Sequence, residues 1–316
     1  MIKTKSLAIV LSICCASSLF SNENSVKLDE ITISTTNMYE TDINNVSKPV
    51  SVIDKEDILT KSPTSVIESI KNTSGVSFSR AGGLGGQLVM RGFNSNDLKI
   101  PMSINGERFR GRNILEYNII DPSRVEKIEV IRGPAAAIYG SESMAGMINI
   151  VTKKPKVSFD KEFTFKPIIQ NMTYESVNDL RGTRIEAEGS GYGFDVQFGA
   201  SYKEANDYET PEGKALNSKF RTKSIDGSIG YSFNENSRLG FNYKISETET
   251  HRAGGLAGNP GMYADLNKRV YMSERPIKER YFGLTYELYP DINGIEKIDT
   301  SIYRRSLWTD VVTTRY

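Results

Sequence analysis

The sequence predicts an α+β domain followed by antiparallel strands of a transmembrane β-barrel. Helix signals occur only in the first half of the chain, where they alternate with short apolar runs. After Pro155 the helix signals stop, and segments that alternate apolar and polar residues take over. An export signal stands ahead of both regions.

The first 21 residues have the three-part layout of a signal peptide. Lys3 and Lys5 precede the apolar run 7–16, and small residues follow it near Ser21. This run is too short for a membrane helix, which needs roughly 20 apolar residues. An alternative is a lipoprotein signal acylated at Cys14, although Ile13 is bulky where a small residue is preferred.

Composition excludes several classes of function. The two cysteines both fall inside the signal, so cleavage near Ser21 leaves no thiol for disulfides, metal ligation or catalysis. The 40 basic and 39 acidic residues become 38 and 39 when the two signal lysines are removed, a net charge of −1 with His neutral. This balance gives no indication of nucleic-acid binding.

Residues 46–154 have the pattern of the α+β domain, and residues 22–45 that of a flexible tail. The domain's helix is expected to begin with Ser62 as its cap and Pro63 in its first turn, and to end at Gly75. A second short helix is expected at Asp121. Expected strands are Val50–Ile53, Val76–Phe78, Gln87–Arg91, Met102–Ile104 and Lys127–Ile131.

Residues 155–316 have the pattern of barrel strands about 10 residues long. A tight turn is expected at residues 232–238 and a long loop at residues 246–278, which fits short periplasmic turns and long extracellular loops. A soluble β-sandwich is the alternative fold. The expected strands are Phe163–Phe165, Arg184–Glu188, Phe194–Tyr202, Ser224–Phe233, Arg238–Ile245, Tyr281–Leu288 and Ile298–Tyr303.

Four motifs in the first half carry a family resemblance. They are Leu88–Phe93, Ser103–Glu107, Val125–Gly140 and Ala145–Lys153. In order and spacing this set resembles the plug domain of TonB-dependent outer-membrane receptors. The resemblance implies a bacterial outer-membrane receptor without enzymatic activity or a resident cofactor. Receptors of this family take up a scarce nutrient, usually haem or a ferric siderophore and sometimes cobalamin.

The resemblance also assigns a role to a short strand-like segment in the tail. The segment resembles the TonB box, the contact for the inner-membrane partner TonB, and its alternating Ile31 and Ile33 suit strand addition to a partner sheet. An ordinary tail with some β-propensity is the alternative. The residues concerned are Asp29, Glu30, Ile31, Thr32, Ile33 and Ser34.

Three charged residues match plug positions that face the barrel wall in the family: Arg91, Glu129 and Arg132. The resemblance implies that they seat the plug reversibly. The alternative is that they are solvated turn residues.

Candidate ligand-binding residues are basic or able to bind iron. The resemblance places Arg80, Arg108, Arg110 and Arg112 on outward loops, where they would attract an anionic iron complex. A solvated basic loop is the alternative. His251 and Tyr263 fall on the expected long loop, and His251 could ligate haem iron, although a lone loop histidine is more often just solvated.

The chain departs from the family in length. A plugged transporter needs about 22 strands. Residues 155–316 supply seven or eight, so we expect a fragment of an iron-complex receptor. A non-transporting exported binding module, or an adhesin on a small barrel, is the alternative.

Overall fold

The structure is a computed structural model. It describes residues 32–33, 41–42, 49–80, 82–84, 86–95, 100–109, 120–135, 140, 142–211, 213–253, 270–292, 294–295 and 297–315. The chain divides into residues 1–32 and residues 33–316, and the second unit contains the α+β domain and the strands that follow it. Within the described ranges, no helix has the length and apolar character needed to cross a membrane.

The α+β domain contains a five-stranded and a three-stranded sheet. The larger sheet has the order β3-β9-β10-β7-β8 and the smaller one β4-β5-β6. Their bounds are β3 (Val50–Asp54), β4 (Val76–Arg80), β5 (Gly86–Met90), β6 (Phe93–Asn94), β7 (Met102–Ile104), β8 (Glu107–Phe109), β9 (Val125–Arg132) and β10 (Gly146–Thr152). Before residue 49 only β1 (Thr32–Ile33) and β2 (Thr41–Asp42) are described.

The predicted start of the first helix, with Ser62 as its cap, is wrong. Two helices occupy this region, α2 (Lys55–Lys61) and α3 (Val66–Ser69). Ser62 ends α2 in the left-handed conformation, with φ 41°, so it cannot cap a following helix, and Ser65 caps α3 instead. The 3₁₀ helix η4 (Pro122–Arg124) confirms the second prediction, with Asp121 as its N-cap.

Helix α3 and its C-cap residue bury an apolar face. Val66, Ile67 and Ile70 are all fully buried, and they join a core cluster with side chains from both sheets. Ile277, from the second half of the chain, belongs to the same cluster. The core of the α+β domain therefore extends to the large sheet that follows it.

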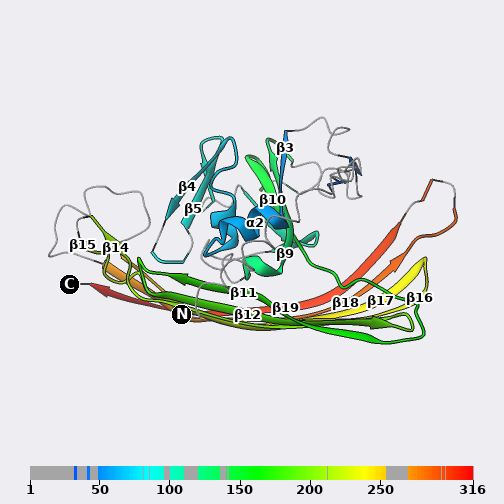
Figure 1. Ribbon diagram of the computed structural model, residues 1–316. Helices are drawn as coiled ribbons and strands as arrows, with labels where there is room; N and C mark the ends of the chain where they lie inside the picture. The colour runs from blue at the N-terminus through cyan, green and yellow to red at the C-terminus, as the bar shows by residue number, and fades with distance from the viewer. Residues whose placement is uncertain are drawn as a thin grey trace, which may run out of the picture. The chain divides into compact units, whose positions relative to one another are not determined.

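All seven strand segments expected after Pro155 are confirmed as one antiparallel sheet, which we call the wall. Its order is β11-β12-β13-β16-β17-β18-β19, so each strand pairs with the next along the chain, apart from the small hairpin of β14 (Glu209–Thr210) and β15 (Gly213–Lys214). The wall strands are β11 (Thr164–Glu175), β12 (Leu180–Gly191), β13 (Phe194–Ala205), β16 (Phe220–Asn234), β17 (Ser237–Ala253), β18 (Val270–Leu288) and β19 (Ile298–Arg315). The described strands form an open sheet, curved around the α+β domain (Figure 1).

The expected long loop is shorter than predicted, because β17 continues to Ala253 and β18 begins at Val270. Thr248 and Thr250 point inward here and are almost fully buried. Glu249 between them is polar as well, so this part of the strand shows no alternation of apolar and polar residues. Lys278 pairs across strands with Glu247 at 3.6 Å. Such cross-strand pairs support a strand that carries no apolar pattern.

A glycine marks a close approach between the α+β domain and the wall. Leu84 packs in an apolar cluster with Leu180, Ala205 and Phe220 of the wall. Beside it, a Cβ on Gly83 would overlap the carbonyl oxygen of Ser218 and lie 3.1 Å from the Phe220 ring.

We predict that Gly83→Ala lowers the free energy of unfolding by about 1–3 kcal/mol, because the backbone of Ser218 has no flexible end that can move away. Urea titration of the refolded protein measures this change. Ser77→Ala, at an exposed position of β4, is the control and should have little effect. Equal stability of the two variants would contradict the close packing.

Candidate functional site

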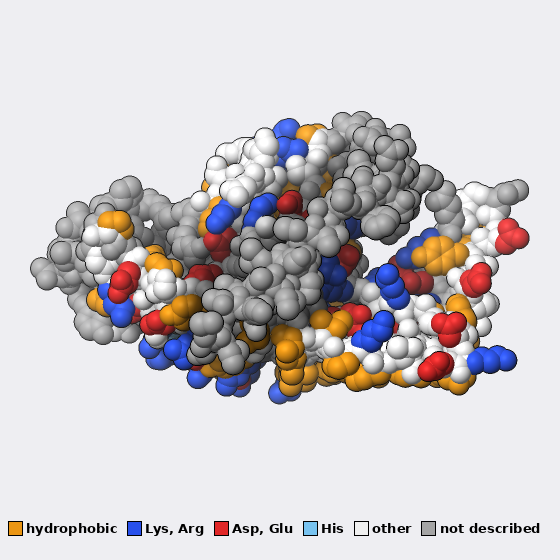
Figure 2. All heavy atoms as spheres, viewed as in Figure 1, with side chains coloured by type: hydrophobic (Ala, Val, Ile, Leu, Met, Phe, Trp, Pro, Cys, Tyr) orange, Lys and Arg blue, Asp and Glu red, His pale blue; other side chains and the backbone are white. Residues whose placement is uncertain are grey.

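The wall has its polar face inward and its apolar face outward, the reverse of a soluble sheet. Along β12, Arg184 is 1% exposed, Ile185 56% and Glu186 4%. In β16, Ile225 is 56% exposed and its neighbour Asp226 1%. Hydrophobic side chains accordingly gather on the face of the wall that points away from the α+β domain (Figure 2). An outward apolar face is the arrangement of a sheet that contacts lipid.

The inward charges of the wall are paired with one another. The Arg184 guanidinium donates to both carboxylate oxygens of Asp226, at 2.8 and 2.9 Å, and to Glu186 at 3.0 Å. Glu186 also accepts a hydrogen bond of 2.6 Å from Gln197. Pairing of this kind offsets the cost of burying these charges.

The α+β domain adds its own charge to this cluster through η4. The short helix holds Arg124 so that its Nε lies 3.2 Å from Asp226 of the wall. The cap residue Asp121 accepts hydrogen bonds from the backbone N–H and the hydroxyl of Ser123. Burial opposes ionisation of Asp121, but Lys203, Ser123 and Arg184 together hold its pKa below the usual value. The cap therefore stays ionised next to the wall.

A second cluster links β8 to the last two strands. The Tyr281 hydroxyl donates to Glu107 at 2.8 Å, and Arg305 lies 3.8 Å from the same carboxylate. The Arg305 guanidinium packs over the rings of Phe109 and Tyr281, at 4.9 and 4.8 Å. Burial raises the pKa of Glu107, while Tyr281 and Arg305 act in the opposite direction.

Two further contacts join the α+β domain to the wall. Lys154 donates to Glu287 at 2.6 Å, and Lys203 donates to the carbonyl oxygen of Thr64 at 3.3 Å. The interface is thus made largely of hydrogen bonds and ion pairs, together with the apolar contacts of Leu84 and Ile277.

The three predicted contact charges lie within the α+β domain. Glu129 is fully buried, accepts from Asn149 at 3.0 Å and pairs with Lys127 at 3.1 Å. Arg132 donates to the carbonyl oxygen of Ser74 at 2.8 Å. Arg91 has φ 51°, and its guanidinium packs beside Gly133. A role of Arg91, Glu129 and Arg132 in contacting the wall stays a prediction.

Sequence reasoning missed the residues that the structure places at the interface. Glu107 was noted only as part of a motif, and Arg124 was not singled out. One signal could have found the wall partner of Arg124: Asp226 is an acid at an inward position of an alternating strand, where a lone charge would be costly.

Of the predicted ligand-binding arginines, only Arg108 has a described side chain. It pairs with Glu142 and lines a cavity of about 410 Å³ between β8 and the wall. The backbone of Arg80 ends β4, and Arg110 and Arg112 lie outside the described residues.

The expectation that His251 lies on a loop is wrong. It is a residue of β17, 7% exposed, and its Nδ1 lies 2.9 Å from the Ser273 hydroxyl and 3.3 Å from Oδ1 of Asn217. The cause is the extension of β17 and β18 beyond the apolar pattern. Tyr263 lies outside the described residues.

Of the tail segment, only Thr32 and Ile33 are described, as β1. Asp29, Glu30, Ile31 and Ser34 lie outside the described residues, as does the predicted signal peptide.

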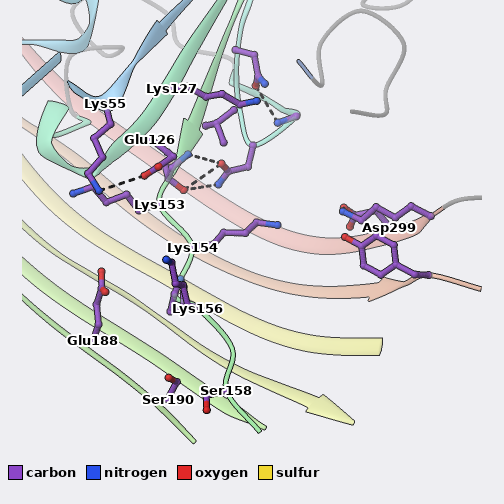
Figure 3. A pocket seen from close by; sticks show the side chains of 18 of the residues that line it. Lys55, Glu126, Lys127, Lys153, Lys154, Lys156, Ser158, Glu188, Ser190 and Asp299 are labelled. Atoms are coloured by element: carbon purple, nitrogen blue, oxygen red, sulfur yellow. Dashed lines mark hydrogen bonds and ion pairs between the residues drawn. The ribbon is translucent and has the colours of Figure 1, made fainter. Parts of the chain in front are cut away.

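A large cavity lies between the α+β domain and the wall. Its volume is about 1760 Å³, and it is lined by residues of β9, β10, β12 and the segment after β10 (Figure 3). Lysines dominate the lining. Across the described part of the chain, no three His, Cys, Asp or Glu side chains are grouped so that they could hold a metal ion.

Comparison with known proteins identifies the family. A family model described as the TonB-dependent receptor plug domain matches residues 42–147. The vitamin B12 transporter BtuB of Vibrio vulnificus is 26% identical over 232 residues, which are 72% of this chain and 37% of that protein. The ferrichrome outer membrane transporter/phage receptor of Escherichia coli is 33% identical over 129 residues, 40% of this chain and 17% of that protein.

Solved structures show the same fold. The siderophore receptor PiuA of Acinetobacter baumannii has a TM-score of 0.65 at 18% identity, covering 91% of this chain and 40% of that one. The copper transporter OprC has a TM-score of 0.65 at 18% identity, covering 81% and 37%. The chain thus spans about two fifths or less of the length of these relatives.

Residues 42–147 are a plug domain of the TonB-dependent receptor family, and the chain is a protein of the bacterial outer membrane. The α+β domain is its plug, and the wall consists of antiparallel strands of the β-barrel.

We predict that Tyr281→Phe raises the pKa of Glu107 further, because the lost hydroxyl stabilises the ionised carboxylate. A raised carboxyl pKa adds stability below the unfolded value, and this contribution is lost as the pH rises through the folded value. At neutral pH the variant should therefore be less stable by about 1 kcal/mol.

Carboxyl titration by ¹³C NMR measures the pKa, with Tyr303→Phe as the control. Tyr303 lies beside Tyr281, with ring centroids 6.1 Å apart. An unchanged Glu107 titration in Tyr281→Phe would show that the hydroxyl does not hold the plug to the wall.

Proposed function

We propose that the chain acts in an outer-membrane receptor for energy-dependent uptake of an iron complex, either haem or a ferric siderophore. The observation that carries the proposal is a plug seated on the polar face of a wall by hydrogen bonds and ion pairs. The opposite face of this wall is apolar.

The chemistry of the contacts suits a plug that moves. Ion pairs such as Arg124 with Asp226 exchange for hydrogen bonds to water when the surfaces separate, so their net strength is modest. Separating a mostly apolar contact of the same area would instead expose apolar surface to water, at a free-energy cost of about 25 cal/mol per Å². Polar seating therefore supports a plug that blocks passage at rest and can be displaced.

Relatives support an iron complex as cargo. Proteins named as ferrichrome transporter, siderophore receptor and iron-regulated outer membrane virulence protein are among them. Arg108 and Arg124 both line the smaller cavity, beside Arg238 and Arg305, and guanidinium groups attract carboxylate-bearing complexes.

Cobalamin is the second candidate cargo. The vitamin B12 transporter of V. vulnificus matches 72% of this chain, a larger share than the ferrichrome transporter does. Calorimetric titration of the refolded chain with haem, a ferric siderophore and cobalamin distinguishes the candidates. Binding of cobalamin alone would overturn the iron-complex proposal.

The energising partner in this proposal is TonB, which would bind residues Asp29–Ser34. Ile31 and Ile33 share one side of an extended segment, and added strands are held by main-chain hydrogen bonds to the partner's sheet edge.

We predict that Ile33→Pro weakens binding of the purified periplasmic domain of TonB about tenfold or more, because proline removes a main-chain donor and resists strand pairing. Biolayer interferometry with the refolded full chain measures the affinity. Ser25→Pro, in the same tail but ahead of the segment, is the matched control. If both variants bind as the unmodified chain does, the segment is not the TonB contact.

A further inference from the structure

The lining of the larger cavity carries more positive than negative charge. We call this space the lysine cavity. Seven lysines line it against four acids. The lysines are Lys55, Lys127, Lys153, Lys154, Lys156, Lys166 and Lys297, and the acids are Glu126, Asp160, Glu188 and Asp299.

Some of these lysines are already neutralised by neighbouring acids. Lys154 pairs with Glu287 at 2.6 Å, and Lys297 pairs with Asp299 at 3.0 Å. Lys55 lies 3.8 Å from Glu126, a long ion pair (Figure 3). The remaining positive charge is concentrated around the segment that leaves β10.

Lys153 is the most unusual of the group. Its side chain is 7% exposed, and within the described part of the chain its Nζ has no hydrogen-bond partner. Its backbone is fixed, since the Lys153 N–H donates to the carbonyl oxygen of Arg124 at 3.0 Å. A buried ammonium without an acceptor is costly, and an added anion would offset that cost.

The charges around Lys153 set its protonation. Burial lowers the pKa of Lys153 below the ordinary lysine value, and the positive charges of Lys55 and Arg184 act in the same direction. Glu186 and Glu126 act in the opposite direction but do not compensate. A bound anion would favour the protonated form, so anion binding should weaken as the pH rises through this lowered value.

We propose that the lysine cavity binds the anionic group, a carboxylate or a phosphate, of the transported ligand. This inference rests on the proposed uptake function and adds the charge class of the cargo. The volume of about 1760 Å³ is ample for such a group, since ligand pockets are commonly about 300–1,000 Å³.

The position of the cavity suits the exit side of the passage. Its lining includes residues 189–190, 294–295 and 297, next to the β12–β13 turn and the β18–β19 connection. The β12–β13 turn is only two residues long, and short turns lie on the periplasmic side of outer-membrane barrels.

The smaller cavity shares part of its lining with the lysine cavity. Both are lined by Asn105, Gly106, Asp299 and residues 152–155. The ion pair of Lys154 with Glu287 lies at this shared segment. A cargo anion in the smaller cavity would therefore compete with Glu287 for Lys154 on its way to Lys153.

Lysine footprinting of the refolded full chain in detergent micelles tests the proposal. The chain is acetylated briefly with an activated ester, in citrate, inorganic phosphate or chloride at equal ionic strength. Mass spectrometry then gives the rate at each lysine. We expect citrate or phosphate to slow acetylation of Lys154 and Lys156 at least about threefold, and to leave the exposed Lys214 of β15 unchanged.

A variant identifies the decisive cation. Lys153→Gln removes the charge and leaves a polar side chain that is one atom shorter, so it should raise the anion concentration for half-protection about tenfold. Lys214→Gln is the matched control and should leave it unchanged. Protection by citrate alone supports a carboxylate-bearing cargo, and protection by phosphate supports a phosphate-bearing one.

The proposal is overturned if chloride protects as well as citrate and phosphate do, or if Lys153→Gln retains full protection. Ile33→Pro separates this result from the TonB contact, because it should leave lysine protection intact even when it abolishes TonB binding. Failure of the unmodified chain to bind TonB, together with intact lysine protection, would therefore count against the uptake proposal and not against the anion site.

Discussion

The pairing of charges on the inner face of the wall is the constraint on which the rest of the structure depends. Arg184, Asp226 and Glu186 are nearly inaccessible, and each would be costly without its partners. They face inward because the outer face carries side chains such as Ile185 and Ile225, as a lipid-facing sheet requires. A polar interior then needs a polar filling, and the plug supplies it.

The plug meets this requirement with few residues placed by short local structures. A cap at Asp121 fixes η4 and so directs Arg124 to Asp226. The turn at Asn105 and Gly106, both with positive φ, starts β8 at Glu107, which meets Tyr281. Local sequence rules thus set the contacts that hold two parts of the chain together.

The sequence was sufficient to predict the order of elements but not the interface. Alternation identified every wall strand, because an outer face such as that of Ile225 must be apolar. It underestimated β17 and β18, where Thr248 and Thr250 alternate with glutamates and leave no apolar signal. The predicted helix start at Ser62 was wrong although serine followed by proline suits a helix start. The backbone of Ser62 adopts the left-handed conformation there and ends the preceding helix α2. The partners of Arg124 and Glu107 lie more than 100 residues away, and no local pattern encodes that distance.

A double-mutant cycle of Arg124→Gln and Asp226→Asn tests the central claim most directly, since it isolates the coupling between one plug charge and one wall charge. The free energies of unfolding of the refolded chain and its three variants give the coupling energy. We predict a coupling of about 1–3 kcal/mol, in the range found for residues in direct contact. A coupling near zero would contradict the account, because the plug would then be held to the wall without this ion pair.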